Sequence, residues 1–290
     1  MRADGQWTVR EVLAWTFERF NRDGLESARL DAEVLLAHAM DLQRVGLYLD
    51  LDRPLDDAER GRYRALVSRR LQREPVAYLV GEREFWSRSF SVDARVLVPR
   101  PETETLVEQA LVTLREFTSP RVLDVGTGSG VIAVTLAAER PDAQVVATDV
   151  SADALEVAAA NAVRHEVAIT LYAGDLLEAL PAGEPLFQLV AANLPYVAPG
   201  ERDSLAPELL AEPTGALFAG DGGLALIKRL ICAASAHLQR PGGAVLLEVG
   251  VGQATTVTQL MIDAGISDRV TVHRDLAGIG RVVEGRLPKG

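Results

Sequence analysis

The chain has 290 residues, of which 48% are hydrophobic and 24% charged, and its formal net charge is −11. This composition is typical of a globular enzyme and excludes a disordered or collagen-like chain. The single cysteine, Cys232, excludes an internal disulfide framework, and its place in an apolar helical pattern predicts a buried structural thiol. No apolar run has the length of a membrane span and the N-terminus has no signal-peptide core, so we expect a cytoplasmic protein.

Residues 1–80 predict a small helical domain. Thr8 and Glu11 have the spacing of a helix-capping box and precede apolar residues at helical spacing. A second helix is expected from about Ser27, and a third within residues 56–75. Glycine and proline are scarce inside these segments, as expected of stable helices.

The third of these helices carries a cluster of arginines, for which two interpretations remain open. In the first, the arginines are solvated positions on one helix; in the second, they form a docking patch for an acidic or RNA-associated partner. Nearly all of the net negative charge lies in residues 91–290, which makes that part of the chain a poor general binder of polyanions. The cluster comprises Arg60, Arg62, Arg64, Arg69, Arg70 and Arg73.

A connector is expected at residues 81–100, between the helical domain and a larger domain at residues 101–290. Apolar and polar residues alternate from Phe85 to Val98 around Asp93-Ala94, which predicts a β-hairpin with its turn at that pair. Pro101 and the glutamates that follow it suit the first turn of a helix.

Residues 101–290 alternate between strand and helix patterns, which predicts an α/β domain with a mostly parallel sheet. The last two strands follow each other without an intervening helix and are expected to finish the sheet in antiparallel fashion. The expected strands are residues 121–125, 143–148 and 168–173, a strand beginning at Phe187, and residues 244–249, 270–273 and 281–284.

Four chemically distinctive groups follow these strands directly. The turn Gly126-Thr127-Gly128-Ser129-Gly130 follows the first strand, Asp149 the second, Asp175 the third and Asn193 the fourth. Because the carboxyl ends of parallel strands share one edge of a sheet, these groups are expected to line a single crevice. A strand, a glycine turn and a helix together are the arrangement of a nucleotide-binding unit.

The spacing of the glycines favours S-adenosylmethionine as the cofactor. A nicotinamide-binding turn usually reads Gly-x-Gly-x-x-Gly, whereas this one reads Gly-x-Gly-x-Gly and follows Asp124. Asp149 is placed to accept the ribose hydroxyls, and Asp124 to lie near the methionine ammonium. The four histidines have no metal-ligand spacing, so no metal is expected. The expected cofactor-binding residues are Asp124, Gly126, Thr127, Gly128, Ser129, Gly130, Asp149, Asp175, Leu176 and Asn193.

The turn Asn193-Leu194-Pro195-Tyr196 follows a buried strand and predicts a grip on a planar –NH₂ group. Pro195 restricts Leu194 to extended conformations, which fixes the direction of the Leu194 carbonyl. The Asn193 side-chain oxygen is a second acceptor beside it. With the glycine turn, these residues resemble the amino-group methyltransferases of the Asn-Pro-Pro-Tyr type, which modify nitrogens of adenine, cytosine or glutamine.

Further segments make the chain similar to the HemK/PrmC family. The most specific is Leu97-Val98-Pro99-Arg100-Pro101-Glu102-Thr103-Glu104, and the similarity covers nearly the whole chain. Members of the family methylate the side-chain amide of the glutamine in the Gly-Gly-Gln loop of peptide chain release factors. The other matching segments are Glu84-Phe85-Trp86, Glu212-Pro213, Gly222-Gly223-Leu224, Glu248-Val249-Gly250 with Gln253, and Arg281-Val282-Val283.

This resemblance implies a Rossmann-like methyltransferase sheet, mostly parallel with an antiparallel last strand, and a helical N-terminal domain joined by a β-hairpin. It also implies S-adenosylmethionine as cofactor, a release factor as partner, and catalytic roles for Asn193, Leu194, Pro195 and Tyr196. Asn193 and the Leu194 carbonyl would accept the two N–H bonds of the amide. Leu194 stands where the family usually has proline, and it retains the backbone carbonyl.

The sequence leaves two functions as alternatives to methylation of a release factor. A methyltransferase acting on an exocyclic amine of ribosomal RNA or DNA is supported by Asn-Leu-Pro-Tyr, which is common in ribosomal RNA adenine dimethyltransferases, and by the arginine cluster. The acidic balance of residues 91–290 opposes it. A non-catalytic cofactor-binding module is disfavoured by the glycine turn, Asp149 and Asn193 together. We expect a monomer that binds neither membrane nor nucleic acid directly.

Overall fold

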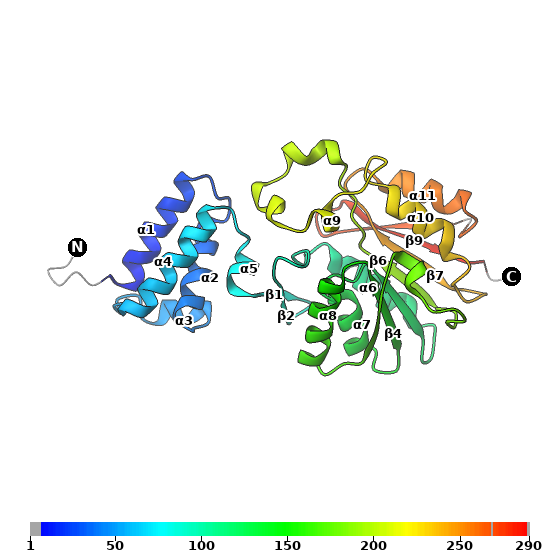
Figure 1. Cartoon of the computed structure of the whole chain (residues 1–290), viewed down its shortest axis with the longest axis horizontal. Coiled ribbons are helices and arrows are strands. Elements are labelled where there is room, and N and C mark those ends of the chain that lie inside the picture. Colours follow the sequence, from blue (N-terminus) through cyan, green and yellow to red (C-terminus); the bar gives the residue numbers. More distant parts are fainter. Residues whose placement is uncertain (1–6, 268, 289–290) are drawn as a thin grey trace. The chain divides into compact units, whose positions relative to one another are not determined.

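The computed structural model describes residues 7–267 and 269–288, which form two compact units (Figure 1). The first unit runs to Gly81 and includes the separate segment Ala206–Ala211. The second consists of Glu82–Leu205 and the chain from Glu212 onward. In the described part, no helix is long and apolar enough to cross a membrane.

The first unit is a helical bundle with its own apolar core. The expected capping box is present: Thr8 Oγ1 accepts from the Glu11 amide, and the Glu11 carboxylate accepts from the Thr8 amide at 2.9 Å. Asp56 and Glu59 form the same box at the start of α4. The helices are α1 (Val9–Arg22), α2 (Ala28–Ala39), α3 (Arg44–Leu49), α4 (Asp57–Leu71) and α5 (Val76–Val80).

Most of the arginine cluster on α4 is engaged in ion pairs within this unit. Arg70 is 6% exposed, and its Nε donates to Asp31 Oδ2 at 2.8 Å. Its Nη2 donates at 3.0 Å to Glu208, which lies in the segment that belongs to this unit. Arg69 pairs with Glu74. Much of the positive charge is therefore balanced locally, which weakens the interpretation of this cluster as an open basic patch.

The β-hairpin lies earlier in the chain than predicted. It pairs β1 (Glu82–Phe85) with β2 (Arg88–Ser91), and its turn is Trp86-Ser87 rather than Asp93-Ala94. The prediction of the turn was wrong because Val96 and Val98 are buried from a loop, where their spacing imitates a strand. Both turn residues have positive φ, 52° and 54°, which sequence pattern did not reveal.

The second unit has a seven-stranded sheet in the order β5-β4-β3-β6-β7-β9-β8, as the α/β prediction required. The first five strands are parallel, and β9 is antiparallel to both neighbours. Strand order reverses between β3 and β6, the position where open parallel sheets bind ligands. The strands are β3 (Arg121–Val125), β4 (Gln144–Asp149), β5 (Ile169–Ala173), β6 (Leu189–Ala192), β7 (Ala244–Glu248), β8 (Val270–Arg274) and β9 (Gly280–Arg286).

Helices lie on the two faces of this sheet (Figure 1), and an apolar core fills the space on each face. Helices α6, α7 and α8 contribute to one core, and α10 and α11 to the other. Strands β3, β4, β6 and β7 are buried almost throughout, as expected for strands covered on both faces. The helices are α6 (Thr103–Leu114), α7 (Val131–Glu139), α8 (Ala152–Arg164), α9 (Thr214–Leu217), α10 (Ala225–Ala234) and α11 (Ala254–Asp263).

Cys232 is exposed, which contradicts the prediction of a buried thiol. Helix α10 is amphipathic, and its buried positions are Ile227, Leu230, Ile231 and Ala234. At about 100° of rotation per residue, position 232 falls on the face of the helix opposite these four residues. The apolar pattern of the segment was identified correctly, but the face that it buries was not.

Candidate active site

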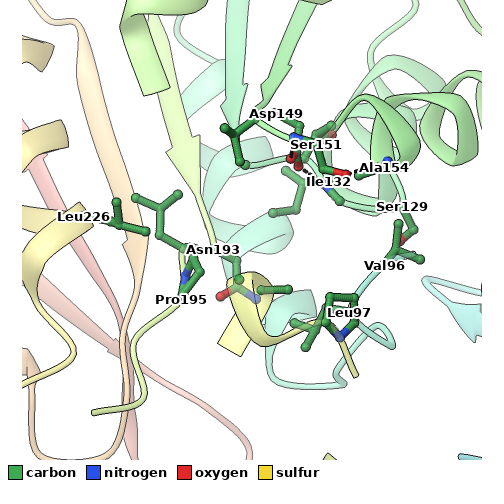
Figure 2. A pocket seen from close by; sticks show the side chains of 18 of the residues that line it. Val96, Leu97, Ser129, Ile132, Asp149, Ser151, Ala154, Asn193, Pro195 and Leu226 are labelled. Carbon is green, nitrogen blue, oxygen red and sulfur yellow. Dashed lines mark hydrogen bonds between the residues drawn. The ribbon is translucent and has the colours of Figure 1, made fainter. Parts of the chain in front are cut away.

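A cavity of about 570 Å³ opens at the carboxyl ends of the parallel strands. Its volume lies within the range of small-molecule binding sites. Figure 2 shows Ser129, Ile132, Asp149, Asn193 and Pro195 around this cavity. The expected residues that line it are Gly126, Thr127, Gly128, Ser129, Asp149, Asp175, Leu176, Asn193, Leu194 and Pro195, whereas Asp124, Gly130 and Tyr196 are not part of its lining.

The glycine turn joins β3 to α7 and fixes Asp149 at the end of β4. Gly126 has a φ of 73°, a conformation that residues with a side chain rarely adopt, and a Cβ there would lie 2.9 Å from Leu194 Cδ2, which would have to move. The Gly128 amide donates to Asp149 Oδ2 at 2.9 Å, and the Ser151 amide donates to Asp149 Oδ1 at the same distance. These bonds hold the carboxylate on the wall of the cavity.

Asp124 does not line the cavity and instead supports the glycine turn through hydrogen bonds. It is fully buried, and its Oδ2 accepts from Thr127 Oγ1 at 2.7 Å and from the Ala133 amide at 3.2 Å. Oδ1 has no hydrogen-bond partner among the described residues. Burial raises the pKa of Asp124 to about 7, although both hydrogen bonds oppose the rise. The position implies support of the turn rather than the expected contact with a cofactor ammonium.

Asp175 and Leu176 follow β5 and lie on the cavity wall. Asp175 Oδ2 accepts from Arg229 Nη2 at 2.8 Å, and Arg229 also lines the cavity from α10. Sequence analysis missed Arg229, since a single arginine in an amphipathic helix has no distinguishing pattern.

Asn193 follows β6 and is tied to the start of α6. Its Nδ2 donates to Thr103 Oγ1 at 3.0 Å, which leaves its side-chain oxygen as the acceptor still available. Leu194 is 3% exposed and belongs to the core on the α10 face. Burial raises the pKa of the Tyr196 phenol to about 12, so it stays protonated at neutral pH.

The backbone of Tyr196 is held by the loop that follows β7. Gln253 Nε2 donates to the Tyr196 carbonyl at 2.9 Å, while Gln253 Oε1 accepts from the Gly250 amide at 2.9 Å. A Cβ on Gly223 would lie 2.0 Å from the Tyr196 carbonyl oxygen, so this glycine is required by close packing.

A buried glutamate, Glu212, connects the segment of residues 97–104 to the part of the chain that follows the turn at residues 193–196. Glu212 accepts from the Val98 amide at 2.9 Å and pairs with Arg100. Pro213, next along the chain, lines the cavity. The resemblance had identified the segments that contain Thr103, Glu212 and Gln253, but their contacts could not be inferred from the sequence. The described residues contain no cluster of three or more candidate metal ligands.

Comparisons with known proteins agree with this architecture. Residues 11–81 match the PrmC N-terminal domain family, and residues 103–240 match the methyltransferase small domain family. The fold is similar to a crystal structure of a methyltransferase from Pyrococcus furiosus, with a TM-score of 0.51 and 18% identity over 77% of this chain and 97% of that one.

Curated relatives extend the similarity to the full length. The chain is 43% identical to the release factor glutamine methyltransferase of Geobacter sulfurreducens over 97% of both chains. It is 46% identical to that of Cereibacter sphaeroides over 96% of this chain and 98% of the other. With its fold, its cavity at the switch point of the sheet and these relatives, the chain belongs to the family of release factor glutamine methyltransferases.

Proposed function

We propose that the chain transfers a methyl group from S-adenosylmethionine to the side-chain amide of the glutamine in the Gly-Gly-Gln loop of a peptide chain release factor. The observation that carries the proposal is the hydrogen bonding of the Asn193 side chain. Its amide nitrogen is committed to Thr103, so its oxygen remains as an acceptor at the cavity. The substrate follows from the names of the curated relatives.

The cavity has the features that the cofactor requires. The turn from Gly126 to Gly128 allows close approach of a ligand to the backbone, and Asp149 has a carboxylate for the ribose hydroxyls. Asp175 and Arg229 form an ion pair at the next strand end. When bound, S-adenosylmethionine supplies an electrophilic methyl group on a sulfonium.

An amide nitrogen is a weak nucleophile because its lone pair is delocalised into the carbonyl. The rate of methyl transfer therefore depends mainly on how the enzyme positions this nitrogen. The Asn193 oxygen and the Leu194 carbonyl accept the two N–H bonds of the substrate amide and orient its nitrogen. As positive charge develops on the nitrogen, the same two acceptors stabilise it. Pro195 shapes the cavity wall, and the proton leaves after methyl transfer, so no strong base has to act first.

Replacement of Asn193 by alanine tests the role of its oxygen. Asn193→Ala should lower kcat by about 100-fold, since one preorganised charge-stabilising contact is lost. The dissociation constant of S-adenosylmethionine, measured by calorimetry, should change by less than about twofold, because the glycine turn and Asp149 remain intact. A variant that methylates its protein substrate at the wild-type rate would contradict this role.

An exocyclic amine of a nucleic-acid base is the second substrate class, because it offers a similar planar –NH₂ group to the same two acceptors. The negative charge of residues 91–290 opposes this choice. We further propose that the chain acts in the cytoplasm as a monomer and without a nucleic-acid partner.

A further inference from the structure

Glu248 is a buried carboxylate that the mechanism above does not use. It is the last residue of β7. This strand pairs with β6, which ends directly before Asn193 in the chain. The residue is 1% exposed, and neither carboxylate oxygen has a hydrogen-bond partner of standard geometry among the described residues. Because burial of a carboxylate without well-formed hydrogen bonds destabilises the fold, Glu248 is a candidate for a functional role.

The surroundings of Glu248 connect it to Asn193. Burial raises the pKa of Glu248 to about 7, and the neighbouring Thr103 hydroxyl acts in the opposite direction. Arg281 and Arg100 also lower this pKa, while Glu102 raises it. The strand register agrees with this: Ala192 of β6 pairs with Leu247 of β7, so the residues that follow them, Asn193 and Glu248, are neighbours. Thr103, which bonds Asn193, is therefore near both side chains.

The Thr103 hydroxyl has one proton to donate, and this proton does not go to the Asn193 nitrogen. Thr103 is buried, and its Oγ1 accepts from Asn193 Nδ2 at 3.0 Å. An oxygen that accepts from Asn193 has its own proton free for a different acceptor. The ionised form of Glu248, which prevails above about pH 7, can only accept, so the hydroxyl then donates towards it and not towards Asn193.

We propose that Glu248 is a positioning residue that sets the direction of the Asn193 amide through Thr103. The carboxylate takes the Thr103 proton, Thr103 in turn accepts from Asn193 Nδ2, and the Asn193 oxygen is left facing the substrate. The inference rests on the proposed function, because the direction of the amide matters only if the substrate brings N–H donors. Without the carboxylate, Thr103 can donate to the Asn193 oxygen, and the amide can turn its nitrogen to the substrate.

Glu248→Gln tests this relay at nearly constant shape. The glutamine amide can donate to Thr103, which frees the hydroxyl to bond the Asn193 oxygen. The kcat should fall by about 10-fold or more, as when a charge-stabilising contact is impaired, while the affinity for S-adenosylmethionine stays within about twofold. The second readout is the affinity of the enzyme for a release factor. A release factor with glutamate in place of its target glutamine should bind the variant more tightly than it binds wild type, because the turned amide now offers a donor.

The relay also predicts how two substitutions combine. Thr103→Val removes the intermediate, so Glu248→Gln should cause no further loss of kcat in the Thr103→Val background. Two independent losses that multiply would overturn the relay, even if each single variant were impaired.

The chain contains a matched control pair on the same helix and sheet. Thr113 is a buried threonine of α6 whose Oγ1 donates at 3.3 Å to Glu284, a buried glutamate of β9. Neither residue lines the cavity. Thr113→Val and Glu284→Gln should leave kcat within about twofold of wild type, whatever they do to stability.

Two results would overturn the inference. The first is a Glu248→Gln enzyme with the wild-type kcat and the wild-type preference between glutamine and glutamate. The second is an equal loss of kcat in Glu284→Gln, which would assign both effects to the fold. Failure of the proposed function would look different, because wild type itself would then transfer no methyl group to the release factor.

Discussion

Leu194 links the substrate turn to the glycine turn at the scale of single residues. Its carbonyl is the second acceptor proposed for the amide, and its side chain belongs to the core on the α10 face. Its Cδ2 would lie 2.9 Å from a Cβ at Gly126, so the two turns pack directly against each other. Leucine in place of the usual proline thus keeps the backbone acceptor and provides an apolar contact with the glycine turn.

Asp124 gives a prediction for the dependence of stability on pH. Burial raises its pKa from 3.8 to about 7, so the folded protein binds a proton there that the unfolded chain releases from about pH 4. Stability from this group is complete below about pH 4 and is lost as the pH rises to about 7. Asp124→Asn removes this loss. Its free energy of unfolding, relative to wild type, should therefore rise by up to about 4 kcal/mol between about pH 4 and pH 8.

Urea unfolding of both proteins without cofactor, at a series of pH values, measures this difference. Contributions from the other carboxylates cancel, because both proteins contain them. A difference between the two proteins that stays constant from pH 4 to pH 8 would show that Asp124 does not titrate in this range.

At the scale of elements, the loops after β6 and β7 support each other. Gln253 bonds the Tyr196 carbonyl and the Gly250 amide, so one side chain joins the two loops. Gly223 lies against the same carbonyl, and its φ is 86°. The orientation of the Asn-Leu-Pro-Tyr turn therefore depends on residues about 30 and 60 positions further along the chain.

Adjacent glycines allow this packing to be tested with a matched pair. Gly222 and Gly223 both have positive φ, but a Cβ on Gly222 would meet no atom within 4 Å. Both alanine variants carry similar backbone strain of about 1 kcal/mol or more. Only Gly223→Ala should also displace the Tyr196 backbone and lower kcat for methyl transfer by about 10-fold or more. Equal kcat in the two variants would rule out a role for this contact in positioning.

Local patterns were sufficient to predict the strands, most helices and the shared edge of the sheet. Strand β3 and the glycine turn are contiguous in sequence, so their relation could be read directly. The hairpin turn could not be located, because burial of Val96 and Val98 in a loop produces the same alternation as a strand. The hydrogen bond between Asn193 and Thr103 joins residues 90 positions apart in the chain, and only the fold brings these together.

At the scale of the whole molecule, function is expected to involve both units. The second unit contains the cavity and the acceptors, whereas the first is a helical bundle whose family match is the PrmC N-terminal domain. Segment Ala206–Ala211 belongs to the first unit, where Glu208 pairs with Arg70 and Arg73. These pairs leave less free positive charge for RNA than the arginine count suggests, which favours a protein substrate.

The most direct test of this account is transfer of a labelled methyl group from S-adenosylmethionine to purified release factor, with the modified residue located by mass spectrometry. A release factor with alanine in place of the Gly-Gly-Gln glutamine and purified ribosomal RNA are the two controls. We predict label on the side-chain amide of that glutamine and none on either control. Label on ribosomal RNA alone, with the release factor unmodified, would contradict the account.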